Sequence, residues 1–68
     1  MQLSARNQLA GTVVGINQGE AIANVELEVA GQRLVASITV EAVQQLGLQP
    51  GTEIVAVIKA SDVMIGIA

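Results

Sequence analysis

The first half of the chain alternates apolar and polar positions in the way that is typical of β-strands. Residues 21–29 place four apolar side chains on one face and polar side chains on the other, which predicts a strand with one buried face. Residues 33–39 resume the alternation after Ala30-Gly31-Gln32, so the two segments are expected to form a hairpin. Residues 8–16 are rich in β-branched side chains and end at a turn-like stretch, which predicts a strand before this hairpin.

From Thr39 the spacing of the apolar residues changes from two to three. Val40, Val43 and Leu46 then share one face of a helix, which predicts a short helical segment. Thr39 precedes it as a suitable N-cap, and Gly47 follows it where a left-handed residue often ends a helix.

The remaining apolar segments are residues 53–59 and 63–67, and both are expected to be strands buried on two faces. The order of elements predicts an all-β fold: a five-stranded, OB-like Greek-key barrel with one short helix between strands three and four. An SH3-like barrel is the alternative. Gly11 and Gly15 indicate a bent first strand, unless they merely weaken it. Residues 1–68 form a single predicted domain.

Composition predicts that this domain does not remain a monomer. The 68 residues are 51% hydrophobic and only 13% charged, and they include no cysteine or histidine. A domain of this size has a marginal core, and neither a disulfide nor a typical zinc site is available to strengthen it. We therefore expect a homo-oligomer with extensive buried interfaces.

The composition and the short apolar runs also argue against several classes of partner. No apolar run approaches the roughly 20 residues that span a bilayer, and residues 1–8 lack the apolar core of a secretion signal. A cytoplasmic location is therefore the default expectation, with no membrane partner. Three basic residues, a net charge of −3 and the lack of aromatic residues argue against nucleic-acid binding.

Catalysis is also disfavoured, because the residues that most often exchange protons or attack carbon near neutral pH are missing. Glu26 and Glu28 form a pair of carboxylates two positions apart. They lie on the polar face of a predicted strand, where charges keep strands soluble, and we favour that structural explanation. The expectation is a protein without enzymatic activity or catalytic cofactor.

The few cations are more informative. Arg6 lies within Ser-Ala-Arg-Asn-Gln at 4–8, and Lys59 within Lys-Ala-Ser-Asp at 59–62, each at the end of a predicted strand. Both are surrounded by short residues whose hydroxyl, amide and backbone groups are able to donate hydrogen bonds to a small oxyanion. The alternative is that they are ordinary surface charges. Arg33 is expected to be a solvated strand residue.

Around these two cations the sequence resembles the molbindins, the small molybdate-binding Mop proteins. The resemblance is carried by Ser-Ala-Arg-Asn-Gln-Leu at 4–9, Gly-Thr-Val-Val-Gly at 11–15 and Val-Ile-Lys-Ala-Ser-Asp-Val-Met at 57–64. Leu46-Gly47 and Pro50-Gly51 also fit the pattern. The same module is similar to the ligand-binding domains of molybdate-responsive regulators and of molybdate-transporter ATPases.

The resemblance implies a homohexamer, built as a trimer of dimers, that binds molybdate or tungstate at subunit interfaces for intracellular molybdenum storage. Oxyanion contacts are implied for three segments, with no direct protein–metal ligand: Ser4, Ala5, Arg6 and Asn7; Thr39; and Lys59, Ala60 and Ser61. Ala42 departs from the family, in which a second hydroxyl is frequent at this position. A second class of site near the threefold axis is implied without assigned residues.

A different class of function stays open beside this one. A structural or regulatory adaptor that binds a protein partner would also need exposed apolar surface, and its cations would then be incidental.

Overall fold

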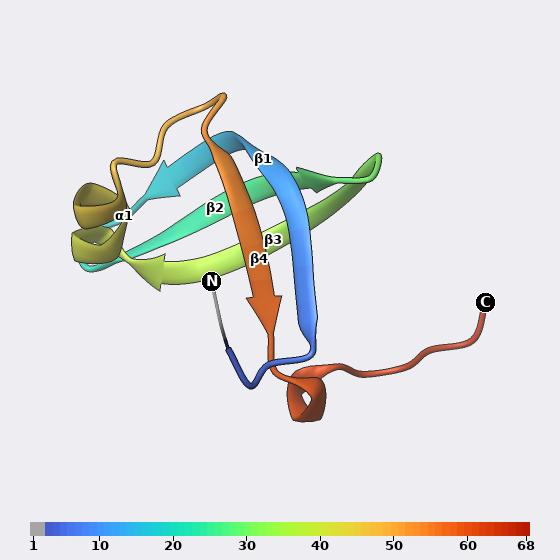
Figure 1. Cartoon of the computed structure of the whole chain (residues 1–68). Helices are drawn as coiled ribbons and strands as arrows, with labels where there is room; N and C mark the ends of the chain where they lie inside the picture. Colours follow the sequence, from blue (N-terminus) through green and yellow to red (C-terminus); the bar gives the residue numbers. More distant parts are fainter. Residues whose placement is uncertain (1–2) are drawn as a thin grey trace.

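Strand β1 (Asn7–Gln18) joins the two halves of a four-stranded antiparallel sheet, whose strand order is β3-β2-β1-β4. The computed structural model describes residues 3–68 (Figure 1). Met1 and Gln2, which belong to the segment inspected for a secretion signal, lie outside the described residues. No helix among residues 3–68 has the length and apolar character needed to cross a membrane.

The predicted hairpin is formed by β2 (Ile22–Val29) and β3 (Gln32–Thr39), which pair in unbroken antiparallel register from Ile22↔Thr39 to Val29↔Gln32. Ala30 and Gly31 both have positive φ, at 50° and 79°, as a two-residue hairpin turn requires. The Gly31 N–H donates to the Glu28 carboxylate at 2.6 Å. The buried face of β2 consists of Ala23, Val25 and Leu27, as the alternation predicts.

β1 is bent, as its glycines suggested. Its register against β2 shifts between Val13 and Gly15, so the strand carries a bulge there. Residues 7–12 pair with β4 (Glu53–Ile58), whereas residues 12–18 pair with β2. At the bend, the Val13 N–H donates to the Thr52 carbonyl at 2.9 Å, and the Gly51 N–H donates to the Val13 carbonyl at 2.8 Å.

Helix α1 (Val40–Leu46) begins and ends where the sequence predicts. Thr39 Oγ1 accepts a hydrogen bond from the Ala42 N–H at 3.0 Å, which caps the N-terminus. Gly47 adopts the left-handed conformation with φ 64°, and Leu48 N–H donates to the Val43 carbonyl at 3.1 Å. The helix packs against β2 and β3 at the open end of the hairpin, away from the turn at Ala30 and Gly31.

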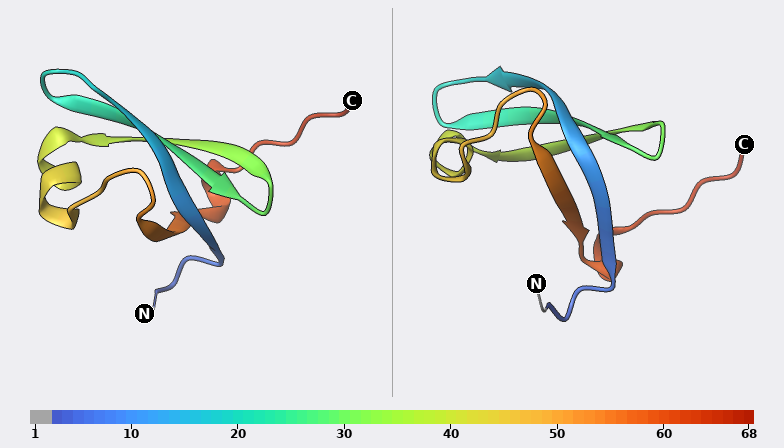
Figure 2. Two further views of the ribbon diagram at one scale, coloured as in Figure 1. Left: turned by 90° about the horizontal axis from the view of Figure 1, so that it is seen from above. Right: turned by 45° about the horizontal axis from the view of Figure 1, so that its top comes forward.

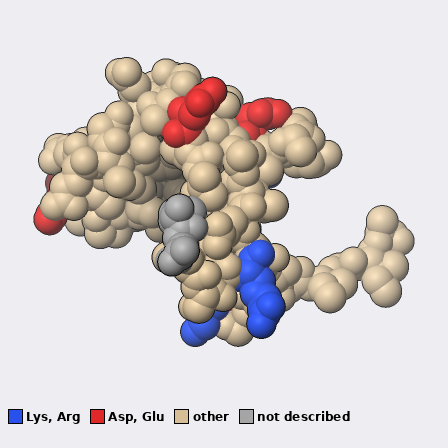
Figure 3. Space-filling model, viewed as in Figure 1, with Lys and Arg blue, Asp and Glu red and all other residues tan. Residues whose placement is uncertain are grey.

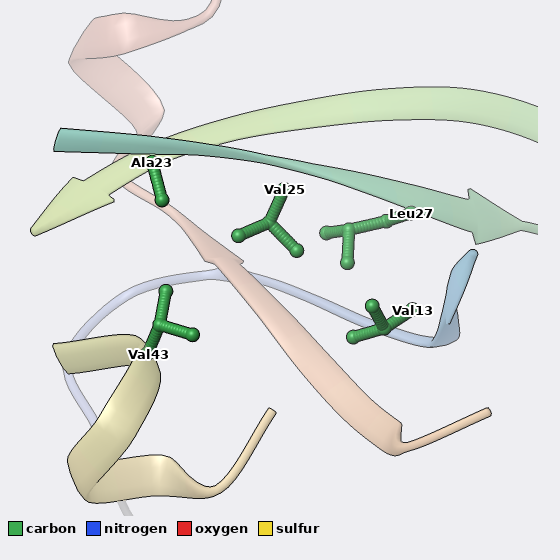
Figure 4. Packing of buried hydrophobic residues seen from close by; sticks show 5 residues of the cluster. All are labelled: Val13, Ala23, Val25, Leu27 and Val43. Atoms are coloured by element: carbon green, nitrogen blue, oxygen red, sulfur yellow. The ribbon is translucent and has the colours of Figure 1, made fainter. Parts of the chain in front are cut away.

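The core is small and lies between β1, β2 and α1. Figure 4 shows the side chains of β2 directed toward Val13 of β1 and Val43 of α1. Five side chains are buried in this cluster: Val13, Ala23, Val25, Leu27 and Val43. At least twelve large hydrophobic side chains of the described residues are exposed. The single chain therefore hides only part of its apolar surface.

The expected fifth strand is wrong for the single chain. Residues 63–68 form no strand and extend away from the sheet (Figures 1 and 2). A strand forms only when a neighbouring backbone pairs with it, and this segment has no such neighbour in the part of the chain that the structure describes. The sheet is therefore not closed into a five-stranded barrel.

The expectation that both late segments are buried on two faces is also wrong. In β4, Ile54, Ala56 and Ile58 are half-buried, while Val55 and Val57 are exposed. In the segment 63–67, Ile65 is 93% exposed and Ile67 98%. An apolar run indicates which surface favours burial, but no segment among residues 3–68 covers the second face.

Candidate functional site

An open pocket of about 680 Å³ lies where β1 begins and β4 ends. A single 3₁₀ turn, η1 (Ala60–Asp62), follows β4 and forms one wall. The pocket is lined by the start of the described chain and by the residues around this turn: Ser4, Ala5, Arg6, Val57, Lys59, Ala60, Ser61 and Asp62. Two predicted segments far apart in sequence are thus brought together.

The pairing of β1 with β4 accounts for this meeting. Asn7 pairs with Ile58, which places Arg6 and Lys59 one position beyond the two strand ends. The Asn7 side chain strengthens the junction, because its Nδ2 donates to the Ile58 carbonyl at 3.2 Å. Asn7 was predicted to contact an oxyanion. In this structure its half-buried side chain joins the two strands that carry the cations.

The electrostatics of the pocket are set by two cations and one carboxylate. Arg6 and Lys59 are exposed, and the described residues give neither an ion-pair partner. Asp62 also lines the pocket and offsets one of the two positive charges. Figure 3 shows Lys and Arg side chains together at the lower end of the molecule, with acidic side chains at the upper end and the left. Two of the three basic residues, Arg6 and Lys59, therefore lie at one pocket in a protein whose net charge is −3.

Neutral donors surround these charges. Ser4 and Ser61, which carry hydroxyl groups, both line the pocket. Their neighbours Ala5 and Ala60 line it as well. The Asp62 N–H is already committed, since it donates to the Lys59 carbonyl at 2.9 Å and closes the η1 turn. Such a set of hydroxyl and cationic donors suits a tetrahedral oxyanion.

Thr39 is not part of this cluster within one chain. It pairs with Ile22, alongside the Gln18 end of β1, whereas Arg6 precedes the Asn7 end of the same strand. The Thr39 hydroxyl accepts from the Ala42 N–H, so its own hydrogen is left to donate. Thr39 and Lys59 therefore lie at different ends of the sheet within one copy of the chain.

Ala42, the departure from the family, is half-buried on α1 and contributes its backbone N–H to the helix cap. Its methyl group offers no hydrogen bond. The position therefore supports Thr39 through the main chain alone.

The two paired carboxylates of β2 have structural partners. Glu26 accepts from Arg33 at 2.8 Å, and Glu28 accepts from the turn at Gly31. The hydrogen bond from Arg33, assisted by its charge, lowers the pKa of Glu26 from its ordinary value. Arg33 is exposed, as predicted, but it is paired with a carboxylate rather than with water alone.

Two lining residues were missed by reasoning from sequence. Asp62 follows the predicted Ser61 directly and lies in the same turn. Its place in the segment 59–62 could have indicated that it lines the pocket. Val57 lies in the pocket wall because β4 ends there, which no sequence pattern indicated. No group of three or more histidine, cysteine or acidic residues suited to a metal ion occurs among residues 3–68.

The family model described as the TOBE domain matches residues 3–65. The chain belongs to the TOBE-domain family. The molybdenum-pterin-binding protein 1 of Clostridium pasteurianum is 50% identical over 66 residues, covering 96% of this chain and 97% of its own length. The resemblance to the Mop proteins is thereby confirmed.

Solved structures agree with this assignment. A molybdate-binding protein from Sporomusa ovata is 36% identical, with a TM-score of 0.93, and 98% of this chain and 100% of that chain are covered. The cytoplasmic molybdate-binding protein ModG, solved with molybdate bound, is 41% identical with a TM-score of 0.85. The match covers 88% of this TOBE chain and 43% of the ModG chain. The names of these relatives describe binding rather than catalysis.

Proposed function

We propose that this TOBE chain binds molybdate in the pocket that unites Arg6 with Lys59. The observation that carries the proposal is the meeting of two cations and two serine residues at the junction of β1 and β4. Relatives named for molybdate or molybdenum-pterin binding, alike over nearly the whole chain, support the same ligand class. Tungstate has the same charge and shape and is included in the proposal.

The complete site lies between copies of the chain. Lys59, Ala60 and Ser61 line the pocket of one copy, while Thr39 lies at the other end of the sheet and contacts the ligand from a second copy. The exposed apolar side chains give a physical reason for such assembly. A trimer of dimers is the arrangement we propose, with cytoplasmic molybdenum storage as its role, in line with the description of ModG as cytoplasmic.

Calorimetric titration with molybdate tests the proposal, with sulfate and phosphate as matched controls. Hydrogen bonds to a charged group contribute about 1.5–3 kcal/mol each. We therefore expect Lys59→Gln to weaken molybdate binding by about ten-fold to a hundred-fold. Arg33→Gln is the control, because it removes the same charge from a residue outside the pocket.

Three outcomes would contradict the proposal: no binding by the unaltered protein, equal affinity for molybdate and sulfate, or equal losses in the two variants. Absence of any bound oxyanion, together with a partner protein that copurifies at fixed stoichiometry, would favour the adaptor function instead.

A further inference from the structure

The side chain of Asn7 holds the backbone at the point where Lys59 leaves β4. Its Nδ2 donates to the Ile58 carbonyl at 3.2 Å, across a pair of strands whose ladder ends at Asn7 and Ile58. The carbonyl of Ile58 and the N–H of Lys59 belong to one planar peptide unit. The hydrogen bond therefore fixes the plane from which Lys59 continues toward the pocket.

Gln8 has the same relationship to the segment that carries Arg6. Its Nε2 donates to the Ala5 carbonyl at 3.1 Å, and that carbonyl shares a peptide plane with the Arg6 N–H. Successive residues of a strand point to opposite faces, so Gln8 reaches back along its own chain while Asn7 reaches across to β4. Two adjacent residues thus hold the two cation-bearing segments separately.

Neither amide side chain belongs to the lining of the pocket. Among the described residues, the lining is formed by 4–6, 57 and 59–62, so Asn7 and Gln8 lie outside it. Asn7 is half-buried and Gln8 is exposed. An effect of either side chain on a ligand in the pocket must therefore pass through the backbone that it holds.

We propose that Asn7 and Gln8 are positioning residues of the oxyanion site, which order the backbone at Lys59 and Arg6 before the ligand arrives. This inference rests on the proposed molybdate site and names residues that support it without contact. A ligand that binds an unordered segment must also order it, whereas a segment held by a hydrogen bond is ordered on folding. Ordering the backbone of one residue corresponds to about five-fold to thirty-fold in affinity.

Asn7 has the larger effect of the two. Its hydrogen bond is half-buried and joins two strands, whereas the bond of Gln8 lies in solvent and spans three positions of one segment. Water competes more strongly for the donor and acceptor of an exposed hydrogen bond. The backbone at Lys59 therefore depends more on Asn7 than the backbone at Arg6 depends on Gln8.

Calorimetric titration of Asn7→Leu with molybdate is the first test. Leucine has a similar shape but no donor, so we expect binding about five-fold to thirty-fold weaker than in the unaltered protein. Asn24→Leu, the same change in a residue of β2 outside the pocket, is the matched control and should bind as the unaltered protein does. Gln8→Leu should show a smaller loss than Asn7→Leu. Equal affinity in Asn7→Leu and Asn24→Leu would overturn the proposal.

Failure of the proposed function gives a different result. If the unaltered protein binds no molybdate, the site itself is wrong. If the unaltered protein binds molybdate and Lys59→Gln weakens binding, but Asn7→Leu does not, the site stands and only the positioning role is wrong.

Backbone order parameters from NMR relaxation separate positioning from a general loss of structure. In the ligand-free Asn7→Leu protein, the order parameter of the Lys59 N–H should fall, while those of the β2–β3 hairpin stay unchanged. Saturating molybdate should restore the order at Lys59. Weaker binding with unchanged order at Lys59, or a loss of order throughout the sheet, would contradict a positioning role.

A disulfide between the same two positions provides a rescue of the hydrogen bond. Asn7 and Ile58 are directly opposite each other on antiparallel strands, where Cα atoms are about 4.5–5.5 Å apart, a separation that a disulfide spans. The chain has no cysteine, so a protein carrying Asn7→Cys and Ile58→Cys has one pair of thiols in each chain.

The oxidised and reduced forms of this double variant are compared by the same titration, after the reductant has been removed. The oxidised form should bind molybdate about five-fold to thirty-fold more tightly, because the covalent bond holds the backbone that Asn7 holds in the unaltered protein. Equal affinities of the two forms, with the bond confirmed by mass spectrometry, would overturn the proposal.

Discussion

Gly11 lies so close to Glu28 that a Cβ on Gly11 would sit 2.5 Å from the Glu28 carbonyl oxygen. Gly11 is paired with Ile54 of β4, and Glu28 belongs to the ladder between β1 and β2, so neither backbone can move independently. We expect Gly11→Ala to lower the free energy of unfolding by about 1–3 kcal/mol, as other overpacked sites do.

Gly15 provides the control for this prediction. A Cβ there would meet nothing within 4 Å, and Gly15 is not among the residues with positive φ. Gly15→Ala should therefore change the free energy of unfolding by less than about 1 kcal/mol. Urea unfolding followed by circular dichroism measures both variants, since the chain has no aromatic fluorophore. If both variants lost the same free energy of unfolding, the close approach of Gly11 to Glu28 would not be the cause of the destabilisation.

Thr39 should matter for stability before any ligand is added. Its Oγ1 caps α1 by accepting from the Ala42 N–H at 3.0 Å. We expect Thr39→Ala to cost about 1 kcal/mol of stability, whereas Thr39→Ser retains the accepting oxygen and most of the stability. Thermal unfolding of both variants in the same buffer decides between a capping role and a packing role of the methyl group.

The pair formed by Glu26 and Arg33 predicts a dependence of stability on pH. The pKa of Glu26 is lower in the folded protein than in the unfolded chain, so ionised Glu26 favours the folded state. This contribution is fully present above the unfolded pKa, for which 4.5 is the ordinary value, and is lost as the pH falls through the lower folded pKa. Because both side chains are exposed, the effect on stability should be small.

An NMR titration of the Glu26 side chain measures this directly. Arg33→Gln should raise the pKa of Glu26 toward its ordinary value, because both the hydrogen bond and the positive charge are removed. A Glu26 pKa that does not respond to Arg33→Gln would refute the pairing in solution.

Asp62 should oppose oxyanion binding, because its carboxylate lines the same pocket as Arg6 and Lys59. Two unit charges 4 Å apart in water interact by about 1 kcal/mol, which corresponds to about a five-fold change in affinity. We expect Asp62→Asn to strengthen molybdate binding by that order in calorimetric titration. Glu53→Gln, which removes a negative charge at the opposite end of β4, should leave the affinity nearly unchanged. If Asp62→Asn instead bound molybdate more weakly than the unaltered protein, Asp62 would support oxyanion binding and the prediction would be wrong.

Local patterns predicted the local structure well. The alternation in β2, the N-cap at Thr39 and the left-handed Gly47 each depend on residues within a few positions of one another. The fate of residues 63–67 could not be predicted in the same way. Their composition indicates a strand, but whether a strand forms depends on which distant segment lies beside it, and none of the four strands of the sheet pairs with this segment.

The candidate site was predictable only in part for a similar reason. The resemblance and the strand-end positions of Arg6 and Lys59 indicated a shared site, and the structure brings these two residues to one pocket. The sequence could not reveal that Thr39 lies at the far end of the sheet, or that the Asn7 side chain joins two strands. Those facts depend on strand register.

The junction of Asn7 with Ile58 has a consequence for the order of folding. These residues are 51 positions apart, whereas the β2–β3 hairpin closes over a two-residue turn. Loop-closure entropy therefore favours early formation of the hairpin and delays the union of the chain ends. An oxyanion that binds only the completed junction stabilises contacts formed after the transition state. It should act mainly by slowing unfolding, with little effect on the rate of folding.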